Sequence, residues 1–232
     1  MLFKQLFDRE TSTYTYLLAD QQTQEAILVD PVLEQVERDL KLLTELGLSL
    51  RYSLETHIHA DHVTGTAKLL EMTGCLGIVP DKAKASCADQ HIKDGEILKL
   101  ASITIKAIAT PGHTDSHNAY LVNQDRVLTG DALFIRGCGR TDFQSGDAGI
   151  LFDSVTQRLF SLPDDTLVYP GHDYRGHTVS TIGEEKRWNP RFVGRDRSNF
   201  IEFMASLDLP EPKKIMEAVP ANERCGNLLF TR

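Results

Sequence analysis

The chain has 232 residues, of which 41% are hydrophobic, and it carries a formal net charge of −8 at pH 7. This length and apolar content predict one domain with a substantial core. The negative charge disfavours nucleic acid as a partner, because a polyanion would be repelled. The longest apolar runs fall short of the roughly 18 residues that a membrane span requires, so a membrane partner is also disfavoured.

Targeting signals and cysteine usage indicate the compartment. The N-terminus alternates like a strand and carries no secretory signal, so a cytoplasmic location is expected, or the mitochondrial matrix if a transit peptide has been removed. The four cysteines are widely spaced without a CxxC pair. This usage is more typical of a reducing compartment than of a disulfide scaffold.

Short runs of apolar residues bounded by Gly, Pro, Asn or Asp predict strands. We expect strands over Leu2–Phe7, Tyr14–Ala19, Ala26–Val29, Arg51–Glu55, Leu76–Val79, Ile97–Leu100, Ile103–Ile108, Ala119–Val122, Arg126–Thr129 and Leu167–Tyr169. Apolar residues near helical spacing predict helices over Leu33–Leu46, Val63–Met72, Ile150–Phe160 and Thr178–Trp188. Strands mixed with helices favour sheets that carry helices on their faces.

A histidine-rich motif, HIHADH, follows the strand predicted over Arg51–Glu55. In an extended segment, His57, His59 and Asp61 would point the same way, because side chains alternate along a strand. His62 stands at the entry to the next helical pattern. Imidazole and carboxylate together suit a metal such as Zn, Fe or Mn, so this motif predicts a metal site.

Three further junctions place a His or an Asp just after a predicted strand. They are His113 in TPGHT, Asp131 in TGDA and His172 in YPGHDY. Each motif alone is a weak signal, since Gly, Pro and Asp also form ordinary turns. Together with the HIHADH motif, they favour one convergent metal pocket built at strand ends.

These motifs, in this order, resemble the metallo-β-lactamase superfamily over about residues 12–177. The resemblance implies an α/β (α+β) fold, an αβ/βα four-layer sandwich with two mixed β-sheets. It further implies a single domain over 1–232 with a short C-terminal extension from about 190. The superfamily's seven ligand positions would map onto His57, His59, Asp61, His62, His113, Asp131 and His172. None is missing, which disfavours a silent scaffold domain and leaves a dinuclear zinc hydrolase open.

A closer resemblance is to the persulfide dioxygenases. It is carried by GDALFIRGCGRTDFQ (residues 130–144), by YPGHDY (169–174), by Asn189-Pro190-Arg191 and by Val219-Pro220-Ala221-Asn222. The alternative is a glyoxalase II-like dinuclear hydrolase of glutathione thioesters, which shares the GCGR element. That family carries a longer C-terminal helical domain, and the short stretch after Asn189-Pro190 argues against it.

The resemblance implies a single Fe(II) held by His57, His113 and Asp131, with two Zn as the alternative. The substrates would be glutathione persulfide and O2, and the products sulfite and glutathione, in sulfide detoxification; a homodimer is also implied. The remaining superfamily positions would orient the ligands or bound water, or would hold a second metal: His59, Asp61, His62 and His172.

Substrate contacts are expected from the resemblance to the glutathione-thioester hydrolases. Tyr174 would reach the peptide backbone of glutathione, and Arg140 and Arg191 would face its carboxylates, because guanidinium offers a bidentate fork. Cys138 is either a redox-sensitive thiol or a small buried packing residue. For the histidines outside the ligand set we expect surface or local hydrogen-bonding roles: His91, His117 and His177.

Overall fold

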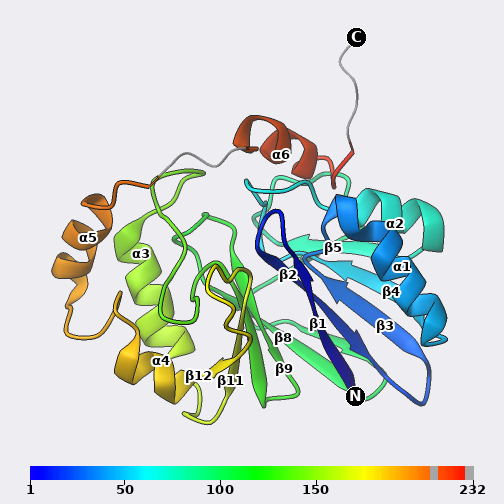
Figure 1. The fold of residues 1–232 in the computed structure, drawn as a ribbon, viewed down its shortest axis with the longest axis horizontal. Coiled ribbons are helices and arrows are strands. Elements are labelled where there is room, and N and C mark those ends of the chain that lie inside the picture. Colours follow the sequence, from blue (N-terminus) through cyan, green and yellow to red (C-terminus); the bar gives the residue numbers. More distant parts are fainter. Residues whose placement is uncertain (210–213, 228–232) are drawn as a thin grey trace. The chain divides into compact units, whose positions relative to one another are not determined.

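The computed structural model describes residues 1–209 and 214–227, and these form two compact units, each built on a six-stranded mixed sheet (Figure 1). The first unit contains Met1–Ile92, Lys99–Ile103 and residues 214–227, and the second contains Lys93–Leu98 and residues 104–209. The two mixed sheets confirm the α/β class that the sequence predicts. The last residues of the predicted extension, 228–232, lie outside the described part of the chain.

The first sheet has the strand order β1-β2-β3-β4-β5-β6. Its strands are β1 (Leu2–Asp8), β2 (Thr13–Ala19), β3 (Glu25–Val29), β4 (Ser49–Leu54), β5 (Leu76–Pro80) and β6 (Gln90–Ile92). The first three pair antiparallel, and β3 to β6 pair parallel. The helical elements of this unit are η1 (Leu33–Gln35), α1 (Val36–Glu45), α2 (Thr66–Thr73) and α6 (Ile215–Asn222).

The core of the first unit lies between its sheet and the helices α1 and α2, which Figure 1 shows side by side along the sheet. Leu17 and Leu28 on the strands, Val36 and Leu43 on α1, and Leu69 on α2 are almost fully buried together. Their burial removes apolar surface from water, which is the main favourable term in folding. The strand ends that carry the histidine-rich motif are therefore fixed by a packed layer.

The second sheet has the order β12-β11-β10-β9-β8-β7. Its strands are β7 (Ile97–Leu100), β8 (Ile103–Ala109), β9 (Asn118–Val122), β10 (Arg126–Gly130), β11 (Leu167–Pro170) and β12 (Ser180–Thr181). Its helices are α3 (Ala148–Asp153), the π-helical turn η2 (Ser154–Leu159), α4 (Ile182–Trp188) and α5 (Arg197–Ala205). In the described part of the chain, no helix has both the length and the apolar content needed to cross a bilayer.

The helices of the second unit bury its sheet in the same way. Val127 on β10 and Val168 on β11 pack with Leu151 on α3, Val155 on η2 and Phe200 on α5. β10 and β11 are parallel neighbours, so the residues that follow them, Asp131 and His172, emerge at the same edge of the sheet.

The predicted elements are confirmed with corrections at four helices. The helix expected over Leu33–Leu46 begins with the 3-10 turn η1, and the one expected over Ile150–Phe160 is α3 followed by the π-helical η2. The helix expected over Thr178–Trp188 begins only at Ile182, because Ser180–Thr181 pairs with β11 and the Thr181 hydroxyl then accepts a hydrogen bond from Glu184 N, as an N-cap does. The helix expected from Val63 begins at Thr66, because the Val63 carbonyl accepts a hydrogen bond from Leu33 N. The strand β6 and the helices α5 and α6 were not predicted.

The cysteine pairing differs from the expectation that widely spaced cysteines are typical of a reducing compartment rather than of a disulfide scaffold. Cys87 and Cys225 form a disulfide across a sequence separation of 138 residues. Only Cys75 and Cys138 are free thiols, and both are buried. Spacing carried no signal for this pair, because bridges over such separations depend on the fold rather than on a local motif.

Candidate metal centre

The histidine-rich motif occupies the loop that leaves β4 at Leu54 and reaches α2 at Thr66. Although it is a loop, His57 and His59 are 1% exposed and His62 is 0% exposed. The side chain of Asp61 is 29% exposed. Buried polar groups are stable only when they are hydrogen-bonded or bind a metal, so the partners of each imidazole indicate what it can do.

His57 is oriented by Asp30 through Thr56. The Thr56 hydroxyl donates to Asp30 Oδ2 at 2.8 Å and lies 2.9 Å from His57 Nδ1. Because the hydroxyl proton is used on Asp30, His57 Nδ1–H is the donor in the second contact. The lone pair of His57 is therefore on Nε2, which is the tautomer a metal ligand needs.

His59 faces two buried carboxylates. Its Nε2 lies 3.1 Å from Asp30 Oδ1 and 3.4 Å from Glu55 Oε2. Burial lowers the pKa of His59, but the charges and hydrogen bonds of Asp30 and Glu55 outweigh burial and hold that pKa well above its usual value. Nδ1 of His59 is buried and has no hydrogen-bond partner among the described residues.

Asp61 and His62 form a hydrogen-bonded pair. His62 Nδ1 lies 2.9 Å from Asp61 Oδ2, which also accepts from the Thr13 hydroxyl at 3.2 Å. Within the described part of the chain, the buried His62 Nε2 is without a hydrogen-bond partner. The ligand atoms of His59, Asp61 and His62 all lie within 4.8 Å of one another, so these three residues could together hold a cation.

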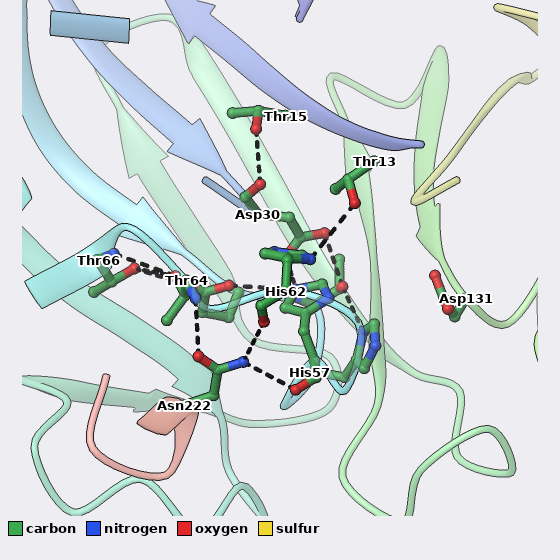
Figure 2. A network of polar contacts seen from close by, with 12 residues as sticks. Thr13, Thr15, Asp30, His57, His62, Thr64, Thr66, Asp131 and Asn222 are labelled. Carbon is green, nitrogen blue, oxygen red and sulfur yellow. Dashed lines mark hydrogen bonds and ion pairs between the residues drawn. The ribbon is translucent and has the colours of Figure 1, made fainter. Parts of the chain in front are cut away.

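Asn222 ties this loop to the C-terminal helix α6. Its side-chain amide donates to the His59 carbonyl at 2.9 Å and to the His62 carbonyl at 2.8 Å, and its oxygen accepts from Thr64 N at 2.8 Å. Figure 2 shows Asn222 beside the loop, with dashed lines to these groups. One buried side chain thus replaces the regular backbone pairing that the loop lacks.

In the second unit, His113 and Asp131 form a close pair. His113 Nδ1 donates to the Arg140 carbonyl at 2.7 Å, which leaves the lone pair on Nε2. That Nε2 lies 3.4 Å from Asp131 Oδ2. An imidazole lone pair and a carboxylate oxygen repel each other at this distance, so the arrangement fits a cation that both atoms would bind.

His172 approaches the other oxygen of the same carboxylate. Its Nε2 lies 3.6 Å from Asp131 Oδ1, and this oxygen is buried without a hydrogen-bond partner among the described residues. The ring of Tyr174 stacks on His172 with centroids 5.9 Å apart. Asp131 therefore presents its two oxygens to two different histidines.

In each unit, buried donor atoms fit a metal ion. In the first unit His62 Nε2, and in the second unit Asp131 Oδ1, is a buried acceptor without a hydrogen-bond donor in the described residues. Leaving such atoms unpaired is costly, and neighbouring hydrogen bonds assign a metal-compatible tautomer to His57, His62 and His113. Nitrogen and carboxylate donors of this kind suit Zn, Fe or Mn.

The residues expected to meet substrate have partners of their own. Arg140 pairs with Asp142 through two contacts of 2.7 Å and stacks over Phe143 at 4.4 Å. The Arg191 guanidinium lies 5.1 Å from the ring centroid of Phe203. Tyr174 is 70% exposed. Substrate binding by Arg140, Arg191 and Tyr174 therefore stays a prediction.

Cys138 is a packing residue rather than a reactive thiol. It is buried, with its Sγ 4.0 Å from Met204 Sδ. Burial is the main reason that the pKa of Cys138 is raised to about 12, the charge of Arg191 lowers it, and the charge of Asp131 adds to the rise. A thiol that stays protonated near neutral pH is a poor nucleophile.

Sequence reasoning missed several residues that support the ligands. Asp30 directly follows a predicted strand, and Asp131 comes two residues after another, so this similar position could have identified Asp30. Thr13 gave no local signal, and Asn222 was noted only within the Val219-Pro220-Ala221-Asn222 segment, with no role assigned. Of the remaining histidines, His91 is exposed and the side chain of His177 is 44% exposed, as expected for surface residues. His117, in contrast, is buried.

The fold and this arrangement of histidine and aspartate residues define a protein of the metallo-β-lactamase superfamily, and the family model of that name matches residues 8–172. The chain is 46% identical to the mouse and human proteins named mitochondrial persulfide dioxygenase ETHE1, with 97% of this chain and 89% of each relative covered. The crystal structure of ETHE1 from Myxococcus xanthus matches with a TM-score of 0.96 and 53% identity, over 98% of this chain and 100% of that one.

The chain therefore belongs to the persulfide dioxygenase ETHE1 family, and it is an enzyme. A more distant match is the crystal structure of TTHA1623 in a di-iron-bound form, with 28% identity and a TM-score of 0.67 over 81% of this chain and 98% of that one. That likeness covers 81% of this chain, while the ETHE1 structure covers 98% of it.

Proposed function

We propose that this enzyme uses one Fe(II), held by His57, His113 and Asp131, to oxidise glutathione persulfide with O2 to sulfite and glutathione. The observation that carries the proposal is the 46% identity to persulfide dioxygenases over 97% of the chain. The reaction consumes one persulfide, one O2 and one water and releases glutathione, sulfite and two protons. The terminal sulfur loses four electrons, and O2 gains them.

Two histidines and one carboxylate form the ligand set of non-haem iron sites with open positions. Bound there, Fe(II) would supply the redox chemistry that O2 and the persulfide sulfur need, which Zn²⁺ cannot supply because it has one oxidation state. The chain's own residues would fix the ligands: Asp30 acts on His57 through Thr56, and the Arg140 carbonyl acts on His113. His59, Asp61, His62 and His172 would orient these ligands and bound water.

The proposal extends to the glutathione moiety. Tyr174 is exposed beside His172, where its hydroxyl could donate to a peptide carbonyl of the substrate. Arg140 forms a bidentate pair with the Asp142 carboxylate, and a substrate carboxylate would take the place of Asp142 in the same geometry. Arg191 offers a second guanidinium held over an aromatic ring.

A second candidate function is a dinuclear hydrolase of glutathione thioesters. The observation that favours it is the group of His59, Asp61 and His62, whose ligand atoms lie within 4.8 Å of one another and which includes the buried acceptor His62 Nε2. The related structure of TTHA1623 was solved with two irons. The two candidates differ in metal content and in the need for O2.

The test combines ligand variants with product analysis. Protein purified without oxygen should contain about one iron per chain and should turn glutathione persulfide into sulfite and glutathione in equal amounts. Asp131→Ala should lose both iron and activity, whereas His62→Ala should keep its iron. Loss of all metal from His62→Ala would contradict the single-iron assignment and would favour the dinuclear site.

A further inference from the structure

His117 lies directly behind the proposed ligand Asp131. It is 1% exposed, and its Nε2 accepts a hydrogen bond from Asp131 N at 3.0 Å. Its Nδ1 lies 2.8 Å from the Thr110 hydroxyl. The superfamily's ligand positions do not include His117, and from the sequence we expected only a surface or local hydrogen-bonding role for it.

The donors and acceptors fix the form of this imidazole. A backbone N–H can only donate, so Nε2 of His117 carries a lone pair. The proton of the neutral ring is therefore on Nδ1, which donates to the Thr110 hydroxyl. Thr110 N in turn donates to the His117 carbonyl at 2.9 Å, so Thr110 and His117 hold each other through both backbone and side chain.

Asp131 needs this partner because it stands just outside the sheet. The pairing of β10 with β11 shifts register between Leu128 and Gly130, and Gly130 has a φ of +48°. The N–H of Asp131 is bonded to His117 instead of to a strand, and its carbonyl accepts from Gly139 N at 2.8 Å. The N–H of Asp131 is thereby bonded to a side chain, and its carbonyl is bonded to the backbone.

The same ring also contacts the second proposed ligand of this unit. His113 and His117 meet edge to face, with centroids 6.2 Å apart and an interplanar angle of 84°. One buried side chain thus supports the backbone of Asp131 and the imidazole of His113. Groups that orient metal ligands in this way typically change metal affinity or activity by about 10–100-fold when they are removed.

We propose that His117, as its Nδ1–H tautomer, is a positioning residue that aims the Asp131 carboxylate at the metal. The inference rests on the proposed function, in which Asp131 binds the metal. It predicts that the acceptor at Nε2, rather than the bulk of the ring, is what the site requires. Glutamine can offer an acceptor near the position of Nε2, whereas leucine fills the space without one.

The test is titration of the metal-free full-length protein with Co(II) alone, following its visible absorption spectrum. Relative to wild type, His117→Leu should weaken Co(II) binding by about 10–100-fold and alter the spectrum. His117→Gln should restore binding to within about threefold and return the wild-type spectrum. His91→Leu, at an exposed histidine, is the matched control and should change neither. If His117→Leu does not fold, Thr110→Val, which removes the acceptor for Nδ1–H, should weaken binding in the same direction.

The outcomes separate this inference from the proposed function. Wild-type affinity and spectrum in His117→Leu would overturn the inference, and so would equal losses in the Leu and Gln variants, because packing alone would then account for them. If Asp131→Ala binds Co(II) as wild type does, the ligand assignment itself fails. Loss of binding in Asp131→Ala together with normal binding in His117→Leu refutes the inference and leaves the proposed function standing.

Discussion

Gly139 and Asp131 touch so closely that only glycine fits. Gly139 N donates to the Asp131 carbonyl at 2.8 Å, and a Cβ at Gly139 would lie 2.5 Å from that oxygen and 2.8 Å from His113 Nδ1. Real Cβ atoms do not approach backbone atoms this closely, so a side chain would displace both proposed ligands. The GCGR element therefore shapes the site through its backbone.

The first prediction compares the two glycines of this element. Gly139→Ala should lower iron content and activity at least tenfold, because the ligands must shift. Gly137→Ala should change both less than twofold, since a Cβ there meets Phe134 at an ordinary 3.5 Å. Metal analysis and initial rates on the two purified variants provide the measurement. Equal iron content and activity in the two variants would show that the close approach of Gly139 to Asp131 does not matter for function.

The second prediction concerns Asn222. Asn222→Ala removes three buried hydrogen bonds and leaves the carbonyls of His59 and His62 without this donor. The free energy of unfolding in urea should fall by about 2–4 kcal/mol. Asn227→Ala, at an exposed asparagine in the same C-terminal segment, is the control and should stay within about 0.5 kcal/mol of wild type. If Asn222→Ala changed the free energy of unfolding as little as the control does, the hydrogen bonds of Asn222 would not be needed to stabilise the loop.

The third prediction is a pH dependence of stability. Burial raises the pKa of Asp39, and the hydrogen bond and charge of Arg38 lower it only in part. A raised folded pKa means that the ionised carboxylate destabilises the fold above that pKa, and that this penalty vanishes below the unfolded value of about 3.8. Asp39→Asn should therefore unfold at a higher urea concentration than wild type at pH 7, and at the same concentration below pH 3.8.

An exposed carboxylate provides the contrast to Asp39. The hydrogen bond from Arg126 holds the pKa of Asp125 below its usual value, against a smaller effect of burial. A lowered folded pKa contributes stability above the unfolded value, so Asp125→Asn should slightly destabilise the protein at pH 7. If Asp39→Asn and Asp125→Asn both gained or both lost stability at pH 7, the directions assigned to the two pKa shifts would be wrong.

The sequence singles out the proposed ligands because each follows the end of a strand, and their role as ligands stays a prediction. His57, His113, Asp131 and His172 follow apolar runs that are broken by Gly, Pro or polar residues, and the structure places these runs as strands. Parallel neighbours such as β10 and β11 then bring Asp131 and His172 to one edge. Local pattern and topology therefore agree for the ligands.

The supporting residues could not be predicted in the same way. Asn222 contacts the carbonyl of His59 across 163 residues, and Cys87 bonds Cys225 across 138. Such contacts depend on how the chain packs, and a single sequence carries no period or spacing that reports them. β12 has only two residues, so its pattern is too short to separate from the helix that follows.

Oxygen uptake is the measurement that tests the central claim most directly. Wild-type protein loaded anaerobically with Fe(II) should consume about one O2 per glutathione persulfide, and the same protein loaded with Zn(II) should consume none, because only iron can change oxidation state. Absence of persulfide-dependent uptake with iron, together with hydrolysis of S-lactoylglutathione by the zinc form, would contradict the dioxygenase assignment and establish the thioester hydrolase.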